Sequence, residues 1–315
     1  MSIAGIIVNY RTPALCLKAV ASQLAELGAH PRIYLVDNAS ADDSVPTFKA
    51  AIEREGWQDQ VDLIAAPRNG GFGYGINLAV RRALATDQPP DFFHVLNPDA
   101  TVEPGSLARL LEFLEQHPEV GLAGSHIRGT DGKTQVAAFR FPSLLGELEN
   151  AASLGLLSRL LAHRTVSIPL PEADCPVDWI SGTSMLIRRS TFEQVGLFDE
   201  EFFLYFEEVD FCRRARQAGL PSWFVAGAPI THVGSAATGM MDETRPMPGY
   251  WFDSRHRYFR KHHGATYAAA CDVARVLGML AWRAKERALS RPGKWRPGML
   301  RDLCLASWRH LRGGR

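Results

Sequence analysis

The sequence places three carboxylates, those of Glu207, Glu208 and Asp210, directly after FFLYF, a run of large apolar and aromatic residues at positions 202–206. Such acids can accept a proton or bind a cation, because a Glu with an unperturbed pKa near 4.3 is ionised at neutral pH. A plainer interpretation is helix capping, since the dipole of a helix N-terminus stabilises an acid by about 0.3–1 kcal/mol. Capping alone leaves the aromatic run in front of the acids unexplained.

Three further polar clusters follow predicted strands: NYRT at 9–12, DNAS at 37–40 and NPDA at 97–100. Open α/β sheets bind ligands in the crevice beyond the carboxyl ends of their strands. Turn chemistry explains any one cluster alone, because Asn, Asp, Ser and Pro initiate turns and cap helices. Together with the glycine-rich segment NGGFGYG at 69–75, the clusters favour a nucleotide-sized pocket.

The glycine-rich segment does not indicate a dehydrogenase. It lacks the spacing G-x-G-x-x-G and follows the third predicted strand instead of the first. Glycines that let the backbone approach a ligand beside a helix N-terminus still suit a diphosphate. An ordinary tight turn explains them equally well.

The first half of the chain alternates β-rich runs with helical stretches, which predicts βαβ units and a mostly parallel sheet. The predicted strands lie at 3–10, 32–38, 61–66, 92–100 and 119–125. The predicted helices begin near Pro13 with Thr12 as N-cap, span 42–55, run from the glycine-rich segment through Ala85, and carry Pro104 in a first turn.

Beyond residue 125 the alternation fails. We expect a hairpin around RGTDGKT (128–134), a strand at GTSMLIRR (182–189) and a short helix to Val195, but the rest of the stretch to 178 gives no assignable pattern. The helix with the three acids should end at Gly219, and PSWFVAGAPITHVG (221–234) supplies further strands. From Tyr250 onwards the pattern is helical and basic.

The charge is distributed unevenly along the 315 residues. The net charge is +1, which excludes a globally basic nucleic-acid binder. Residues 255–315 nevertheless carry fifteen Lys or Arg against three acids, about +12, which leaves about −11 for the rest. A hydrophobic fraction of 46% suffices for a proper core in one large α/β domain or two small ones.

The cysteines and the apolar segments indicate a cytoplasmic protein. The five cysteines are far apart and never form CxxC, so neither a disulfide framework nor a zinc site is predicted. The N-terminus lacks the basic and apolar regions of a signal peptide. The best candidate for a membrane span, residues 265–282, is interrupted by Asp272 and Arg275, each costing roughly 2.5–3.5 kcal/mol at a bilayer centre.

Six motifs resemble, in the same order, those of the family 2 glycosyltransferases, in particular the bacterial rhamnosyltransferase-like branch: VNYRT, VDNASADDS, NGGFGYGINLAV, LNPDA, GTSMLIRRSTFEQVGLFDEEFFLYFEEVDFCRRARQAG and HVGSAA. The resemblance covers about residues 3–265. It implies a GT-A fold, a Rossmann-like, mostly parallel sheet flanked by helices, over 1–250, followed by a basic helical extension over 251–315. It also implies a nucleotide-diphosphate sugar donor, a divalent cation (Mn²⁺ or Mg²⁺) and inversion at the anomeric carbon.

The resemblance also assigns residues to the donor. Asp37 resembles the acid that accepts the imide N–H of a pyrimidine base, which favours UDP or dTDP without excluding GDP. Asn9, Arg11 and Asp99 would surround the ribose and phosphates, although Arg11 is equally well a solvated loop cation. Asn69 and Gly71 of the glycine-rich segment complete the predicted donor site.

The cation site implied by the resemblance departs from the family pattern. The D-x-D element reads Asn97-Pro98-Asp99, so Asp99 is the predicted metal ligand, and the amide of Asn97 offers only a carbonyl oxygen or a contact to ribose. His232 matches the position of a second ligand, and an imidazole favours Mn²⁺ over Mg²⁺. A structural role for this histidine is the alternative.

For the acceptor side, the resemblance assigns the general base to Glu208, where the family usually has Asp, with Glu207 as a competitor. Asp210 either contacts the acceptor or pairs with Arg213 or Arg214 on its own helix. Trp179 either stacks on an acceptor sugar or is an apolar strand residue. The aromatic run in front of the acids should pack under the donor site.

The predicted function is the transfer of a sugar, a deoxyhexose such as rhamnose, from a dTDP- or UDP-sugar to a saccharide or lipid-linked acceptor in bacterial surface polysaccharide synthesis. A non-catalytic glycan-binding or scaffold protein is one alternative, motivated by Asn97 and Glu208 in place of the usual acids. A sugar nucleotidyltransferase is another, but NYRTPAL lacks the glycine-rich, lysine-containing loop expected after its first strand.

The basic C-terminal segment contains Trp251, Trp282, Trp295 and Trp308. Clustered cations and tryptophans suit the surface of an anionic membrane, which predicts peripheral association with the inner face of the cell membrane. A solvated helical surface or a homodimer contact are the alternatives. Nucleic-acid binding is not expected.

Overall fold

The computed structural model describes residues 1–28, 32–234, 240, 242–289 and 293–313. The chain forms two compact units. The sheet unit comprises Met1–Phe139, Pro169–Phe203 and Glu207–Gly239, and the helical unit comprises Arg140–Ile168, Leu204–Phe206 and Met240–Arg315. The helical unit therefore starts before the predicted boundary at 250 and includes two segments from the middle of the chain.

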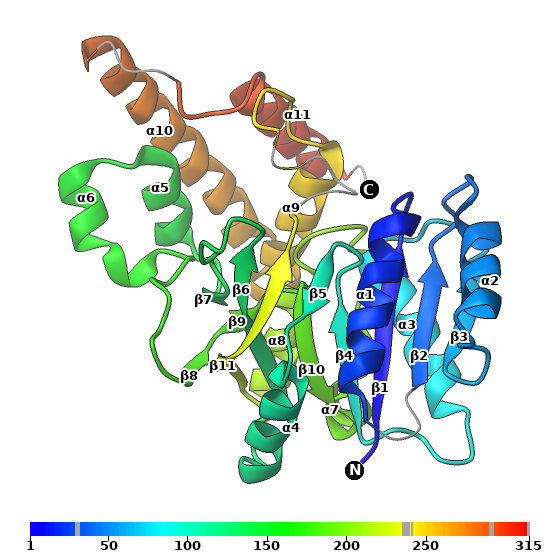
Figure 1. Ribbon diagram of the computed structural model, residues 1–315. Coiled ribbons are helices and arrows are strands. Elements are labelled where there is room, and N and C mark those ends of the chain that lie inside the picture. The colour runs from blue at the N-terminus through cyan, green and yellow to red at the C-terminus, as the bar shows by residue number, and fades with distance from the viewer. Residues whose placement is uncertain (29–31, 235–239, 241, 290–292, 314–315) are drawn as a thin grey trace. The chain divides into compact units, whose positions relative to one another are not determined.

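The sheet unit is built on one sheet, which has nine strands among the described residues. They are β1 (Ile3–Asn9), β2 (Arg32–Asp37), β3 (Val61–Ala65), β4 (Phe92–Leu96), β5 (Ala100–Val102), β6 (Leu122–Gly129), β8 (Cys175–Val177), β10 (Ser184–Arg188) and β11 (Ser222–His232). The spatial order is β3-β2-β1-β4-β10-β6-β11-β5, with β8 paired to β11 (Figure 1).

The predicted mostly parallel α/β sheet is confirmed, and the sheet also contains antiparallel strands that were not predicted. Strands β3, β2, β1 and β4 are parallel neighbours, and β6 is parallel to β11. Strand β10 runs antiparallel to both β4 and β6, and β5 runs antiparallel to β11. The 221–234 segment forms one long strand instead of several, with a register shift between Val225 and Pro229.

The helices of the sheet unit are α1 (Pro13–Glu26), α2 (Ser44–Arg54), α3 (Phe72–Leu84), α4 (Ser106–Gln116), α7 (Arg189–Val195) and α8 (Glu207–Gln217). Helix α1 begins at Pro13 with Thr12 as N-cap, as predicted. Helix α4 begins at Ser106, so Pro104 lies before it and not in its first turn. The residue between them, Gly105, is the N-cap, and its φ of 80° lies in the left-handed region that glycine tolerates.

The hairpin predicted around 128–134 is present, with Arg128 bridged to Thr134 and the Gly129 N–H donating to the Lys133 carbonyl at 2.7 Å. A short second sheet follows, in which β7 (Ala138–Phe139) pairs with β9 (Trp179–Ile180).

A buried polar chain crosses the centre of the main sheet. His94 on β4 contacts Gln23 of α1 through Nδ1 at 2.8 Å and Ser184 of β10 through Nε2 at 3.0 Å. The Ser184 hydroxyl lies 2.7 Å from that of Ser125 on β6. Burial lowers the pKa of His94 to about 3, because a charged imidazole would lose its hydration there.

The low pKa of His94 predicts that the folded protein loses stability in mild acid. Below pH 6.5 the unfolded state takes up a proton at position 94 that the folded state refuses until about pH 3, so stability falls as pH is lowered through this window. The expected slope from this site is up to about 1.4 kcal/mol per pH unit. Urea unfolding of the wild type and of His94→Gln at several pH values measures it; equal slopes in the two proteins would contradict the assignment.

The helical unit consists of α5 (Leu144–Ala152), α6 (Gly155–Leu160), a 3-10 turn (Ala162–Arg164), α9 (Gly249–His263), α10 (Ala265–Leu289) and α11 (Met299–Leu311). Its apolar core joins α5, α9, α10 and α11 through the buried residues Ala151, Phe252, Met279, Met299, Leu303 and Ala306. Helices α5 and α10 pack closely at Gly278, where a Cβ would lie 2.6 Å from the Ala151 Cβ.

A buried ion network accompanies this core. Arg255 of α9 donates to Glu147 of α5 at 3.0 Å and to Asp272 of α10 at 2.5 Å, and Arg275 donates to Glu147 at 2.9 Å. Asp272 and Arg275 are the residues that interrupt the predicted apolar segment 265–282, and both are buried inside the unit. Within the described ranges, no helix combines the length and hydropathy that crossing a membrane requires.

Candidate active site

The ends of β1 and β2 form a buried polar cluster. Asn9 and Asp37 are register partners in the two parallel strands. The Asn9 amide nitrogen donates to Asp37 Oδ1 at 2.8 Å, and Ser40 donates to both Asp37 oxygens, through its hydroxyl at 2.6 Å and its backbone N–H at 3.1 Å. All three residues are buried. Asp37 is therefore held in one orientation at the carboxyl edge of the sheet.

Asn9 makes contacts that the sequence did not predict. Its Oδ1 accepts from the Thr12 N–H at 3.1 Å, and its amide nitrogen is directed to Asp37 and Ser40. The side chain is completely buried. Asn9 thus positions the acid and the following loop, and its contact with a donor ribose stays a prediction.

Arg11 lies in the loop next to this cluster with its guanidinium partly free to reach a ligand. Its backbone N–H donates to the Ser40 hydroxyl at 3.0 Å and its Nε to the Ser40 carbonyl at 3.0 Å. Its φ is 59°, and Ala39 and Ala41 in the neighbouring loop both have a φ of 53°. A non-glycine residue in this region costs of order 1–3 kcal/mol, and such strain is typical of functional sites.

The glycine-rich segment is fixed to the end of β2 by Asn38. The Asn38 amide donates to Asn69 Oδ1 at 3.0 Å and to the Gly71 carbonyl at 2.9 Å. The Gly71 N–H donates to the same Asn69 oxygen at 3.1 Å. Asn38 belongs to the DNAS cluster, but its role as the connection between two loops has no local sequence signal, because its partners lie more than thirty residues away.

Gly71 also brings this segment into contact with the residues that precede the three acids. Its φ is 93°, and a Cβ there would lie 1.8 Å from the Phe203 carbonyl oxygen. The next residue, Phe72, donates its N–H to that oxygen at 3.1 Å. The glycine is required here by close backbone approach, which accounts for its place in the motif.

The first acid of α8 is buried against α3. Glu207 is 3% exposed, and a Cβ placed on Gly73 would lie 3.6 Å from the Glu207 Cβ. Burial raises the pKa of Glu207 well above its ordinary value, and the neighbouring charge of Glu208 adds to the shift. Glu208 itself is half-buried. The backbone before the two acids is strained, with φ values of 67° at Tyr205 and 69° at Phe206.

The aromatic run at 202–206 was predicted to pack under the donor site. In the structure its residues do not pack together as one block. Phe202 is completely buried in the sheet unit, and Phe203 is 38% exposed. Tyr205 and Phe206 belong to the helical unit, where Phe206 contacts Trp251 of α9 with ring centroids 6.2 Å apart. The run fails as a single layer because the chain passes from one unit to the other within it.

Asp210 takes a structural role. Its side chain is completely buried and accepts a hydrogen bond from Arg214 Nε at 2.9 Å, one turn further along α8. Arg214 also donates to the carbonyls of Val195 and Leu197. This ion pair is the alternative weighed for Asp210 against an acceptor contact, and the burial of its carboxylate argues against that contact.

Asp99 and His232 are brought together by sheet pairing. Strands β5 and β11 place Ala100 opposite His232, and Asp99 precedes Ala100. Asp99 Oδ1 lies 3.2 Å from His232 Nε2, and His232 Nδ1 lies 3.1 Å from Gln135 Oε1. The last part of the HVGSAA motif, 235–237, lies outside the described residues.

This pair fits a divalent cation. Because an amide oxygen only accepts, His232 Nδ1 donates to Gln135 Oε1, and the other ring nitrogen, Nε2, is the one that faces Asp99. In the neutral imidazole its lone pair then faces the Asp99 carboxylate, an arrangement that requires a proton or a cation between them. An outer residue that orients a histidine through its other nitrogen is typical of metal ligands.

The protein offers two ligands here and not a complete cage. In the part of the chain that the structure describes, no three His, Cys, Asp or Glu side chains gather closely enough to hold a metal. Mg²⁺ and similar cations are commonly bound by one or two protein ligands together with substrate phosphates. The donor set of Asp99 and His232 is consistent with that mode.

The loops that carry these groups meet within the sheet unit. The Asn97 N–H donates to the Thr183 carbonyl at 2.9 Å, and a Cβ on the preceding Gly182 would lie 3.0 Å from the Phe72 ring. The Phe72 N–H in turn donates to the carbonyl of Phe203, which lies four positions before the first acid of α8. The NPDA segment, the glycine-rich segment and the approach to α8 are therefore neighbours. The position of the polar clusters at strand ends was predictable from the sequence. The contacts between these segments were not.

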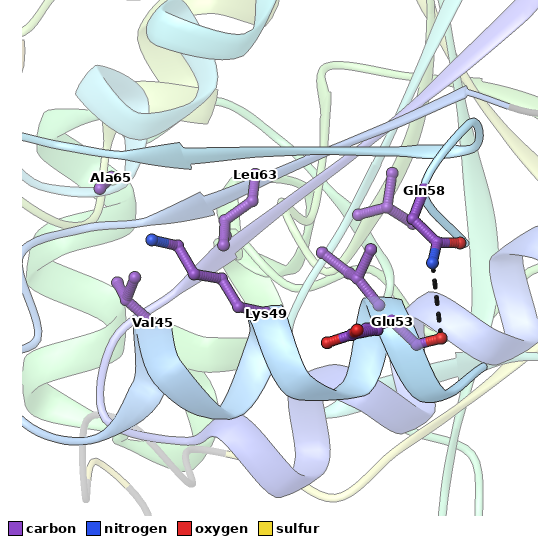
Figure 2. A pocket seen from close by; sticks show the side chains of 8 residues that line it. Val45, Lys49, Glu53, Gln58, Leu63 and Ala65 are labelled. Carbon is purple, nitrogen blue, oxygen red and sulfur yellow. Dashed lines mark hydrogen bonds between the residues drawn. The ribbon is translucent and has the colours of Figure 1, made fainter. Parts of the chain in front are cut away.

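Two other features of the sheet unit bear on the predicted site. Trp179 stacks on Phe139, with ring centroids 4.0 Å apart and an angle of 11°, so at most one of its faces is available to a sugar. A hollow of about 600 Å³ lies between α2 and β3 (Figure 2). Its lining includes Lys49, Glu53 and Leu63 but none of the predicted site residues.

Comparison with known proteins identifies the family. The model of the glycosyltransferase-like family 2 matches residues 2–263. The chain is a family 2 glycosyltransferase. A protein of Mycobacterium tuberculosis, named N-acetylglucosaminyl-diphospho-decaprenol L-rhamnosyltransferase, is 34% identical to this glycosyltransferase over 216 residues, 66% of this chain and 68% of that protein.

Two solved structures share the fold of this glycosyltransferase. A Pyrobaculum calidifontis mannosyltransferase in complex with GDP-Man and Mn²⁺ has a TM-score of 0.58 at 14% identity, covering 99% of this chain and 88% of that chain. GalNAc-T7 with UDP, GalNAc and Mn²⁺ has a TM-score of 0.55 at 15% identity, covering 74% of this chain. The match spans 44% of the GalNAc-T7 chain, less than half of its length. These similarities confirm the predicted GT-A-like architecture.

Proposed function

We propose that this glycosyltransferase moves a deoxyhexose such as rhamnose, with inversion, from a dTDP- or UDP-sugar to a saccharide or lipid-linked acceptor. The arrangement that carries the proposal is the pair Asp99 and His232, in which the imidazole Nε2 lies 3.2 Å from a carboxylate oxygen. The name of the Mycobacterium tuberculosis relative supports the sugar and a lipid-linked acceptor. The Mn²⁺ in both structural neighbours supports the cation.

On the donor side, Asp37 would accept the imide N–H of uracil or thymine. Three hydrogen bonds from Asn9 and Ser40 fix its carboxylate, which reduces the ordering needed when a base binds. The Arg11 guanidinium and the backbone at Gly71, beside the N-terminus of α3, would contact the phosphates.

Asp99 and His232 would hold the cation, with Asn97 able to offer an amide oxygen. The cation, when bound, neutralises the charge that develops on the departing diphosphate. The Gln135 contact to Nδ1 keeps Nε2 available for this role. Asp99 and His232 sit at facing strand ends, so the distance between the two ligands is fixed by the sheet.

On the acceptor side, Glu208 would take the proton of the attacking hydroxyl as the new bond to the anomeric carbon forms and the bond to the diphosphate breaks. Glu207 is less available as a base, because burial raises its pKa and favours the protonated form, which cannot accept the proton. Glu207 would instead support Glu208 from within the packed interface of α8 with α3.

A screen of nucleotide sugars with and without Mn²⁺ tests the proposal. We expect dTDP- or UDP-sugars to raise the melting temperature in the presence of Mn²⁺, because a ligand that binds only the folded state stabilises it, and to release nucleoside diphosphate slowly. Binding of every nucleotide sugar without turnover, even with saccharide acceptors, would contradict enzymatic activity.

The variant Asp99→Asn tests the cation site. We expect the affinity for Mn²⁺ in the presence of nucleoside diphosphate to fall at least about tenfold, since even a residue behind a metal ligand contributes 10–100-fold. Gln135→Leu should lower it less, through loss of the histidine orientation. Titration of Mn²⁺ by calorimetry measures both. An unchanged affinity in Asp99→Asn would place the cation elsewhere.

A further inference from the structure

The two units of the chain carry opposite charge. The helical unit contains nineteen Lys or Arg and eight Asp or Glu, a formal charge of +11. The sheet unit contains the remaining sixteen basic and twenty-six acidic residues, a formal charge of −10. The net charge of +1 therefore hides a strongly basic unit that the donor site does not use.

The cations of the helical unit are more exposed than its acids, of which Glu147, Glu149 and Asp272 are buried. All eight acids are among the described residues, and only Glu243 is exposed. Glu147 and Asp272 neutralise the two buried arginines. The exposed cations among the described residues of the unit are Arg159, Arg164, Arg245, Arg260, Lys261, Arg283, Arg287, Lys294, Arg301, Arg309 and Arg312.

Helix α10 combines this charge with an exposed apolar stripe. Val273, Leu277 and Leu280 are 57%, 56% and 47% exposed and follow the spacing i, i+4, i+7. The opposite side of the helix is buried against the core of the unit. Arg283 and Arg287 continue along the same exposed region towards the C-terminal end of the helix.

Helix α11 repeats the pattern. Leu305, Trp308 and Leu311 are 54%, 53% and 73% exposed, while the opposite face supplies buried residues to the core. The Arg312 guanidinium lies 4.0 Å from the centre of the Trp308 ring, so cation and indole share one patch. An amphipathic ring beside a cation suits the boundary between lipid headgroups and acyl chains.

Membrane association was predicted from four tryptophans, and three of them do not contribute to the exposed apolar surface. Trp251 and Trp295 pack against Arg275, at 5.0 and 5.4 Å from their ring centres, and Trp282 bonds to Glu286. Only Trp308 is exposed. The exposed apolar surface of α10 and α11 is therefore formed mainly by leucines. The tryptophans in the sequence did not indicate this.

We propose that the outer faces of α10 and α11, here called the basic apolar face and defined by Val273, Leu277, Leu280, Arg283, Arg287, Leu305, Trp308, Leu311 and Arg312, dock on an anionic lipid bilayer. Apolar side chains enter the headgroup boundary while arginines bind lipid phosphates. A symmetric dimer through this face would bring two units of +11 together, which opposes association. Nucleic acid would meet the cations but leave the leucines without a partner.

Flotation of the full chain with lipid vesicles tests the proposal without any donor or acceptor, so its outcome is independent of the proposed activity. We expect binding to vesicles of phosphatidylglycerol and little binding to phosphatidylcholine. High salt should weaken it, because the screening length falls from about 8 Å at physiological ionic strength to about 3 Å at 1 M.

Two pairs of substitutions separate charge from burial. Arg283→Gln with Arg287→Gln should lower vesicle affinity about 25-fold, about fivefold for each cation. Leu305→Gln with Leu311→Gln should lower it at least about tenfold, through loss of apolar burial. Val136→Gln is the matched control: Val136 is 48% exposed but lies in the acidic sheet unit, so vesicle binding should not change.

Cys304 provides a direct reading of the contact. It is exposed on α11, whereas Cys16, Cys212 and Cys271 are buried and Cys175 is half-buried. In a Cys175→Ser background, an environment-sensitive dye on Cys304 should shift to the blue when phosphatidylglycerol vesicles are added. A shift that depends on protein concentration without vesicles would show a dimer instead, and equal binding to both lipids would overturn the proposal.

Discussion

Replacement of Glu208 by Gln is expected to lower kcat for sugar transfer by about 10²–10⁴-fold, the range that general base catalysis commonly contributes. Glutamine keeps the size and the hydrogen-bonding reach of the side chain but cannot take the acceptor proton. Because α8 begins with both acids in its packed first turn, the substitution should leave the fold and donor binding intact. Single-turnover kinetics with saturating donor, combined with a thermal-shift measurement of donor binding, separates the two effects.

The neighbouring variant Glu207→Gln is the matched control. Burial raises the pKa of Glu207 well above its ordinary value, which favours the neutral carboxyl, and Gln imitates a neutral carboxyl closely. We therefore expect kcat to change by less than about tenfold, below the range for a general base. A reversed pattern, with transfer retained in Glu208→Gln and lost in Glu207→Gln, would assign the base to the first acid.

The part of the fold that sequence reasoning predicted is the part with locally readable patterns. Buried parallel strands such as β1, β2 and β4 appear as short apolar runs that end in turn residues, and helices between them alternate with the strands. The segment 140–168 gave no such signal. Its helix α5 buries Glu147 and Glu149, so its polar residues do not mark the solvent side, and its partner α10 lies more than one hundred residues away.

The candidate site follows the same division. The residues at strand ends were predictable, because the topology of a parallel sheet gathers them at one edge. The contacts between them were not. Gln135 orients His232 from 97 residues away and lies outside the motifs that the sequence predicted to be functional. Asn38 lies within the DNAS cluster, but the cluster gave no sign that its side chain connects two loops. Asn9 was singled out correctly for its place but not for its burial.

The structure also explains why the aromatic run before the acids is long. Phe202 serves the core of the sheet unit, and Phe206 packs on α9 in the helical unit. Side chains of one short segment therefore pack in the sheet unit and in the helical unit before α8 begins. The strained φ values at Tyr205 and Phe206 occur where this change takes place, next to the proposed base.

Replacement of Glu147 by Gln is expected to destabilise the helical unit by about 3–5 kcal/mol, because removing one partner of a buried ion pair leaves an uncompensated charge. Although burial alone would raise the pKa of Glu147, Arg255 and Arg275 outweigh it and hold the pKa below its ordinary value. Without this carboxylate, two buried guanidiniums share the single charge of Asp272.

Hydrogen exchange of the α5 and α10 amides measures this loss, because the two units need not unfold together and one global transition would mix them. Asp302→Asn is the matched control, since its partner Arg301 is largely exposed and such pairs contribute only about 0–1 kcal/mol. Faster exchange in α5 and α10 of Glu147→Gln alone is the expected result. Equal exchange in the two variants would mean that the apolar contacts around Gly278, and not the ion network, hold α5 on α10.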